Sequence, residues 1–599
     1  MTSMLWSFRR EILGRVLRDF RRCTAALLLL GVAYACKAGN QDSLPAQDPP
    51  APPVATAPRP QANQAPAAGQ EPEKSILQQA AAAAAVEDFN GALNLLDRIR
   101  AESAGDPEFW LAIGAYSFAL GQQRLAEGAS QVAFLFADAA EAYHAAAKLD
   151  AASLPAWSGA VRAEYAQGAL DAAWSAGENY RTRAGAAADP AVLVEIGRIG
   201  LGVTIAEIQA GRPAPAAARA AESALRDAIA GGDPTAAQPL SDLLAWLGRT
   251  ADARETLVAA LSLAPEDTAL FGRLKNLGAA APADHAVALE RVRAAQPRNG
   301  TVLWYLGEAH YLAHAAARTG RDFPRAYESL DRAEESFLDA MALRPDYEES
   351  CRTWLHLVRT SRGWALREEG RVRDAAQAFV AALEADPTRL EASPDPGSLN
   401  LGIYAVVADF FREGLLADAR SLLTRVTAVH DGNADWWNNL AFACRDLAVL
   451  TQEADDADAA AELFEQSWQA YGRCVALSPG DARLVNDRAL ISVYYLDHDH
   501  ELAESELHRA IRLGVEDLAK LPEDVTEEER HRKEEAVGDA WENLAYLDVM
   551  RRGRVDRAED YLTESVNYYP YGLRRGVQTL RREMARLRAA QAGPDDRRP

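Results

Sequence analysis

The sequence predicts an all-α protein built from stacked antiparallel helix pairs, and three observations predict it. The 599-residue chain is rich in Ala, Leu, Glu and Arg, which favour helices, and it lacks long alternations of Val, Ile and Thr. Apolar residues recur three and four positions apart from about Glu73 to Ala590. A pattern of small, large, small and proline residues recurs five times with one spacing, which indicates an internal repeat.

The first element, residues 1–35, has the pattern of a secretory signal peptide. Six arginines precede an apolar run from Cys23 to Ala35, which ends in the small residues Ala33 and Ala35. The run is about a third too short to span a bilayer as a stable helix. We therefore expect export from the cytoplasm.

Cys36 follows this segment directly, and the junction resembles the lipobox of bacterial lipoproteins. In that family the cysteine thiol receives a diacylglyceryl group and becomes the new N-terminus. The match departs from the family pattern at Ala33, where an aliphatic residue is preferred, and at Tyr34, where a small one is. The resemblance implies lipidation of Cys36 and anchoring to the periplasmic or outer face of a bacterial envelope. The alternative is an ordinary signal-peptidase cut before Cys36, which would leave a soluble periplasmic or secreted protein.

Residues 36–72 form a predicted Pro/Ala-rich disordered tether. Nine prolines lie between positions 43 and 72, and Leu44 and Val54 are the only sizeable aliphatic residues there. Such a composition cannot bury a core, and prolines favour extended conformations. A tether after an anchoring cysteine would let a folded domain reach away from a membrane.

Residues 73–572 form the predicted helical repeat array. The five copies of the pattern are Ala253-Leu257-Ala260-Pro265, Ala333-Phe337-Ala340-Pro345, Ala375-Phe379-Ala382-Pro387, Ser467-Tyr471-Cys474-Pro479 and Ala558-Leu562-Ser565-Pro570. Residues at i, i+4 and i+7 share one helix face, so the small residues let two helices approach while the large one fills the space beside them. The proline ends one pair and is tolerated at the start of the next helix.

The helix before two copies of this pattern carries a second motif, Trp437-Leu440-Ala441 in one pair and Trp541-Leu544-Ala545 in another. Together, the two motifs resemble the tetratricopeptide repeat family. The resemblance implies a right-handed α-solenoid that presents a groove to protein partners. Small-residue anchors here lie 36–55 residues apart, against 34 in the family, so we expect an irregular array with some long helices. Residues 573–599 are expected to form a basic capping helix and tail. Contact of this helix with anionic lipid or an acidic partner is the alternative.

Charge and motifs exclude several function classes. The net charge is −23, and residues 1–35 contribute +4, so the remainder carries −27; such a chain is a poor partner for nucleic acid. The sequence contains no phosphate loop, GxSxG or HExxH motif, and its cysteines form no CxxC pair. His310 and His314 share a helix face but have no third ligand nearby. We therefore expect no cofactor, no metal and no enzymatic activity.

Candidate partner-binding residues are the outward positions of two first helices in the groove that the resemblance implies. They are Asn438, Phe442, Arg445, Arg488, Ser492 and Tyr495. The expected function is an extracytoplasmic, lipid-anchored scaffold for protein–protein interactions in cell-envelope assembly or secretion, with envelope proteins as partners. The alternative is a peptide- or carbohydrate-binding subunit that uses the same groove.

Overall fold

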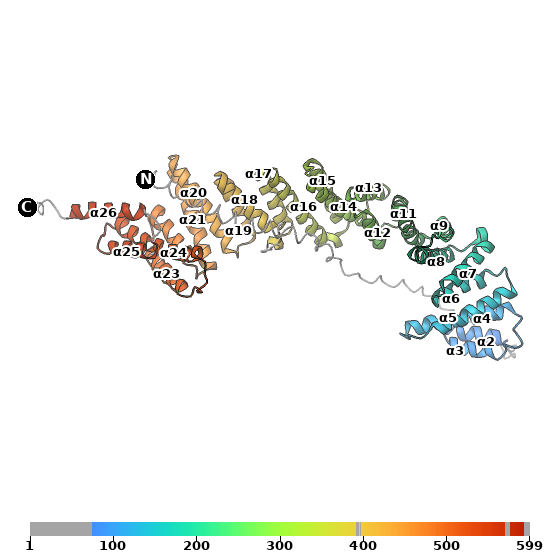
Figure 1. The fold of residues 1–599 in the computed structure, drawn as a ribbon. Helices are drawn as coiled ribbons and strands as arrows, with labels where there is room; N and C mark the ends of the chain where they lie inside the picture. Colours follow the sequence, from blue (N-terminus) through green and yellow to red (C-terminus); the bar gives the residue numbers. More distant parts are fainter. Residues whose placement is uncertain (1–74, 391–394, 396, 570–574, 592–599) are drawn as a thin grey trace, which may run out of the picture. The chain divides into compact units, whose positions relative to one another are not determined.

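The structure, a computed structural model, describes residues 75–390, 395, 397–569 and 575–591, and every regular element in these residues is a helix (Figure 1). The helices follow one another as antiparallel pairs, so the all-α prediction of stacked helix pairs is confirmed. The signal segment, Cys36 and the tether lie outside the described residues. The described chain forms two units, the amino-terminal unit (75–348) and the carboxy-terminal unit (349–591).

The amino-terminal unit contains seven described helix pairs. In order, they are α2 (Ile76–Ala84) with α3 (Phe89–Asp97), α4 (Pro107–Ala126) with α5 (Ala133–Leu149), α6 (Leu154–Ala166) with α7 (Leu170–Ala184), α8 (Pro190–Gln209) with α9 (Pro215–Ala230), α10 (Ala237–Trp246) with α11 (Thr250–Leu263), α12 (Thr268–Gly278) with α13 (Pro282–Ala295), and α14 (Gly300–Thr319) with α15 (Phe323–Leu343).

The carboxy-terminal unit contains five described pairs and a final helix. They are α16 (Glu348–Glu368) with α17 (Val372–Ala385), α18 (Leu399–Glu413) with α19 (Leu416–Val429), α20 (Ala434–Glu453) with α21 (Ala457–Leu477), α22 (Ala482–Ile491) with α23 (His500–Ala519), α24 (Glu527–Tyr546) with α25 (Ala558–Tyr568), and then α26 (Arg575–Gln591). The first helices α22 and α24 continue into π-helical turns, η5 (Ser492–Leu496) and η6 (Leu547–Arg551).

Helix boundaries follow local chemistry. Asp106 and Asp189 cap α4 and α8 by accepting hydrogen bonds from backbone N–H groups of the first turn, and a proline follows each of them at the first helical position. Between paired helices, Gly370 and Gly414 adopt positive φ values of 78° and 75°, which a side chain would disfavour. A glycine at each of these positions lets the chain turn from the first helix of the pair into the second.

The recurring small and large residues of the second helices are buried, and the structure gives the reason for their spacing. Phe379 of α17 is fully buried, and a Cβ added at Gly363 of α16 or at Gly402 of α18 would lie 2.5 Å or 2.6 Å from its ring. Tyr143 of α5 packs in the same way against Gly114 and Gly159. Each of these two rings therefore needs a glycine on its own first helix and another on the first helix of the next pair. Each of these rings joins neighbouring pairs into one core.

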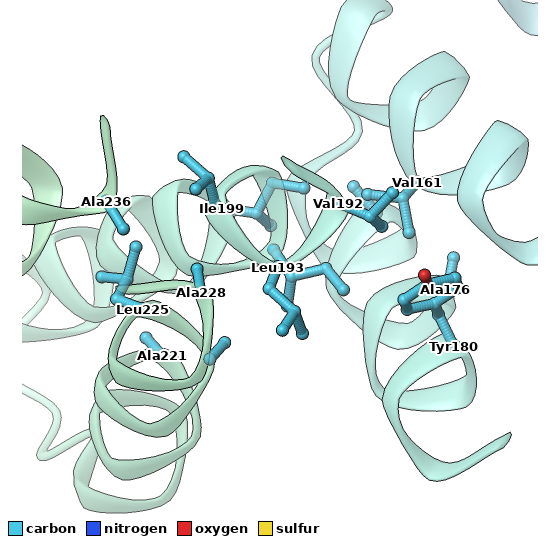
Figure 2. Close-up of a cluster of buried hydrophobic side chains, with 14 of the residues drawn as sticks. Val161, Ala176, Tyr180, Val192, Leu193, Ile199, Ala221, Leu225, Ala228 and Ala236 are labelled. Carbon is cyan, nitrogen blue, oxygen red and sulfur yellow. The ribbon is translucent and has the colours of Figure 1, made fainter. Parts of the chain in front are cut away.

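One buried cluster of the amino-terminal unit extends across several helix pairs, from Ala139 of α5 to Ala253 of α11. Figure 2 shows Val161 of α6, Ile199 of α8 and Leu225 of α9 among the side chains of one buried cluster. Ala221 and Ala228 of α9 are fully buried in the same cluster, and Ala221 faces Gly200 of α8. Small side chains at these contacts allow the helices to pack with few voids.

First-helix tryptophans fix the chain that enters each pair. The indole nitrogens of Trp110, Trp157 and Trp437 donate hydrogen bonds of 2.9, 3.1 and 2.8 Å to the carbonyl six residues earlier, in the preceding loop. Trp541 occupies the matching motif position, but its buried indole nitrogen has no hydrogen-bond partner among the described residues. The reason is that α24 begins early, at Glu527, so the residue six positions before Trp541 already lies within the helix.

The charged segment between Leu513 and Glu535 is divided between a long α23 and the first two turns of α24, which a short loop joins. Lys533 of α24 contacts Asp517 of α23 at 2.7 Å. The irregular repeat length thus comes from helix extension.

Candidate functional site

Three of the six predicted groove residues come together in the carboxy-terminal unit. The Arg445 guanidinium lies 4.5 Å from the centre of the Phe442 ring and 2.9 Å from the Asp446 carboxylate. Burial opposes the charge of Arg445, but Asp446 and neighbouring groups raise its pKa on balance. Burial also raises the pKa of Tyr495, and the nearby Arg445 charge partly offsets that rise. Tyr495 stacks on Phe464 of α21, with ring centroids 4.2 Å apart.

The other three predicted residues lie differently. Asn438 is half-buried on α20. Arg488 bonds to Glu506 of α23 at 2.8 Å and lies over the Trp468 ring of α21, so it joins neighbouring helices. Ser492 is buried, and its hydroxyl donates to the carbonyl oxygen of His498. Arg488 and Ser492 therefore contribute to packing between helices. The remaining candidates for contact with a partner are Asn438, Phe442, Arg445 and Tyr495.

The π-helical turns add aromatic residues that the sequence did not reveal. Tyr494 of η5 and Tyr546 at the end of α24 stack with ring centroids 3.8 Å apart. Arg551 of η6 donates hydrogen bonds of 2.8 and 2.9 Å to the carbonyls of Val493 and Tyr494 in η5. Burial raises the pKa of Tyr494 well above its usual range. Two stacked first helices thus share one tyrosine surface, and π turns are often found at functional sites.

A cavity of about 330 Å³ lies among the first helices of the amino-terminal unit. Its lining includes Tyr165 of α6, Arg198, Gly202 and Ile205 of α8, and Gln238 and Asp242 of α10. The residues of α8 are spaced at i, i+4 and i+7, so they form one helix face. First helices from three successive pairs therefore build one hollow.

The polar groups of this cavity differ in their partners. Asp242 forms an ion pair with Arg273, and burial raises the Asp242 pKa although Arg273 opposes the rise. Arg198 is exposed, and its guanidinium has no hydrogen-bond or ion-pair partner among the described residues. Tyr165 is 47% exposed beside it, and Trp246, one turn after Asp242 on α10, is 48% exposed. The cavity thus offers one unpaired cation beside exposed aromatic surface.

Glycines of α8 provide a matched test of this packing. A Cβ added at Gly197 would overlap the Leu225 side chain, whereas at Gly202 the nearest atom is 3.9 Å away, on Leu170. We expect Gly197→Ala to lower the free energy of unfolding by about 1–3 kcal/mol, because the buried Leu225 must move. Gly202→Ala should raise it by about 0.5–1 kcal/mol, because alanine favours a helix. Urea unfolding of both variants checks the difference, and equal effects would contradict the packing around α8.

The histidine pair of α14 is engaged with other groups. The imidazole of His310 lies 3.1 Å from the Glu290 carboxylate, and Nδ1 of His314 donates to the carbonyl oxygen of Tyr311. Burial lowers the pKa of both histidines. No cluster of three or more metal-ligating side chains lies within the described part of the chain. In the same residues, no helix has the length and apolar character needed to cross a membrane.

The fold and these first-helix faces define an all-α helical-repeat protein. No family description matches the sequence, and no curated protein does. Solved structures with a similar arrangement include the MamA protein, at 17% identity over 36% of this chain and 91% of that chain, with a TM-score of 0.22. The C-terminal part of a TPR repeat-containing protein from Cytophaga hutchinsonii is 12% identical over 51% of this chain and 98% of that one, with a TM-score of 0.26.

Proposed function

We propose that the protein is an exported scaffold, lipid-anchored through Cys36, that holds other proteins of the cell envelope along the faces of its first helices. The observation that carries the binding role is the presence of aromatic and arginine side chains on the first helices: Tyr165 of α6 and Arg198 of α8 are exposed in one unit, and Phe442 and Arg445 of α20 lie together, partly buried, in the other. Aromatic residues and arginine dominate binding energy at protein interfaces. Export and anchoring are supported by the sequence of residues 1–36.

The role is one of binding, without catalysis. Of the groups that burial perturbs most, His285 and His314 lie within the amino-terminal unit and Cys351 and Cys474 within the carboxy-terminal one, each buried by helix packing. A buried thiol with a raised pKa is a poor nucleophile. An extended partner segment lying across successive first helices is the occupant that such faces suit.

Anchoring is tested by fractionating envelopes that contain either the full chain or the Cys36→Ala variant. We expect the full chain in the membrane fraction, with a diacylglyceryl mass on the peptide that begins at Cys36, and the variant released from it. Acyl chains contribute about 0.8 kcal/mol per buried methylene, so loss of the anchor should shift the distribution completely. A full chain that stays in the cytoplasm with residues 1–35 intact would overturn both export and anchoring.

Partner binding is tested by crosslinking in the same envelopes and identifying captured proteins by mass spectrometry. Asn438→Arg places a long charged side chain on the first-helix face, and we expect it to reduce capture of a partner about tenfold. Gln469→Arg, at an exposed position of second helix α21 in the same pair, is the control and should leave capture unchanged. Equal capture by both variants would remove the first-helix face of this pair from the proposal.

A further inference from the structure

We propose that the cavity among α6, α8 and α10 binds the protein's own proline-rich segment around Asp48, so that this segment competes with a partner for the amino-terminal unit. The competition with a partner rests on the proposed function. The docking of the segment does not, and it can be tested separately. The occupant is Gln47–Val54, which reads Gln-Asp-Pro-Pro-Ala-Pro-Pro-Val.

The chemistry of the cavity selects this occupant. Proline-rich segments bind to surfaces lined by aromatic side chains, because they lose little conformational entropy on binding. Tyr165 and Trp246 are each about half exposed at the cavity and on its α10 edge, and Gly202 leaves room above α8. Four prolines follow Asp48 within five residues. They match an aromatic surface that no described residue covers.

Charge provides the second match. Arg198 is the cavity's unpaired cation among the described residues, since Asp242 already pairs with Arg273. Asp48 is the one acid between Ser43 and Gln70, and it directly precedes the prolines. A guanidinium and a carboxylate make hydrogen bonds stronger than those between neutral groups. Asp48 on Arg198 would fix the direction and register of the prolines beside it.

The chain is long enough for this contact. Helix α2 begins at Ile76, and α8 lies three first helices beyond α2, at roughly 10 Å per step. The segment 55–75 separates Val54 from Ile76, and at about 3.1 Å per residue of extended proline-rich chain it reaches roughly 65 Å. The segment 55–75 can therefore span about twice the distance from α2 to α8.

Docking would couple partner binding to the distance from the membrane. With Asp48 bound, only the 12 residues after Cys36 span the gap to the membrane, which is roughly 37 Å when extended. With the segment released, the 39 residues after Cys36, up to Ser75, span it, roughly 120 Å. A partner that displaces the segment therefore lets the amino-terminal unit move farther from the surface.

The test is a site-specific photocrosslink in the full chain. Benzoylphenylalanine replaces Tyr165, and after irradiation trypsin releases the peptide Ala38–Lys74, in which fragmentation locates the link. We expect a link to Gln47–Val54 within the same molecule. The matched control carries benzoylphenylalanine at Phe134, which is 61% exposed on second helix α5, and it should give no link to this peptide.

Charge reversal makes the test specific. Arg198→Glu and Asp48→Lys should each lower the yield of the link about tenfold, and the double reversal should restore it. Gly202→Leu, which fills the cavity from an open position, should lower the yield as well. Circular dichroism of each variant checks that the helices remain.

Three outcomes would overturn the inference: no link to Gln47–Val54, a link only between two copies in a mixture of isotope-labelled and unlabelled chains, or a link that the charge reversals leave unchanged. Failure here together with partner capture in envelopes would remove the intramolecular occupant and leave the scaffold. A link formed without any captured partner would support the intramolecular occupant and remove the scaffold.

Discussion

Replacing Phe379 by alanine should lower the free energy of unfolding of the helices around it by about 3–5 kcal/mol. Its ring is fully buried and lies against the glycines of two first helices, Gly363 and Gly402. Neither glycine has a side chain that could move into the space left behind, so the cavity would persist. Hydrogen exchange of peptides from α16, α17 and α18 measures the effect locally, because units of a repeat protein can unfold separately.

Gln377→Ala, at an exposed position of the same helix, is the control and should change stability by less than about 0.5 kcal/mol. A double variant tests whether the Phe379 ring and Gly402 share one contact. Gly402→Ala alone places a methyl group 2.6 Å from the ring and should destabilise, whereas in the Phe379→Ala background it should be tolerated. Additive effects of the two changes would show that the ring and the glycine do not share one contact.

The sequence predicted those parts of the fold that repeat with a regular helical period. Ala375, Phe379 and Ala382 were assigned to one face from their spacing alone, and all three are fully buried. Gly370 and Gly414 lie where the periodic segments of paired helices meet, and both have positive φ. Such predictions succeed because every turn of a regular helix carries the same geometric constraint.

The candidate site was harder to predict because it depends on local departures from that period. Ser492 was placed on an outward face on the assumption of a regular helix, but η5 begins at this residue and its wider turn changes which side chains face inward. Tyr494 was not selected, although it stacks on Tyr546 of the next first helix. Nothing in a single sequence specifies the residue at which an α-helix becomes a π-helix.

The unpaired charge of Arg198 could not be predicted either. Its neighbour on the cavity wall, Asp242, is an obvious partner from sign alone, yet Asp242 pairs with Arg273 from α12. Which of two arginines an acid binds depends on the stacking of three helix pairs, and hydrophobic periodicity does not encode that choice. The cavity could not be predicted for the same reason, because a glycine such as Gly202 is as compatible with a packed helix as with a binding surface.

Acid should destabilise the amino-terminal unit through two histidines that helix packing keeps neutral. His285 of α13 and His314 of α14 are each 3% exposed. Burial, aided by the charges of Lys275 and Arg254, lowers the pKa of His285 to about 4. Burial lowers that of His314 to about 4, with Arg318 acting in the same direction and the Tyr311 carbonyl opposing it. An unfolded chain has ordinary histidines, with a pKa of about 6.5.

The sign of the effect follows from proton linkage. Below pH 6.5 the unfolded state binds a proton at each of these two histidines, whereas the folded state binds them only near pH 4. The contribution of the two histidines to stability is therefore constant above about pH 7 and decreases as the pH falls from 6.5 to 4. At pH 5 the loss should be about 2 kcal/mol for each histidine. Urea unfolding at pH 7 and pH 5, followed by hydrogen exchange in α12–α15, measures it. His285→Gln and His314→Gln each remove one titrating group, so each should reduce the pH 7 to pH 5 difference by about 2 kcal/mol, whatever the substitution does to stability at pH 7. His310, whose pKa burial also lowers, contributes in the same direction and remains in the double variant. An undiminished difference in the double variant would assign the acid sensitivity to other groups.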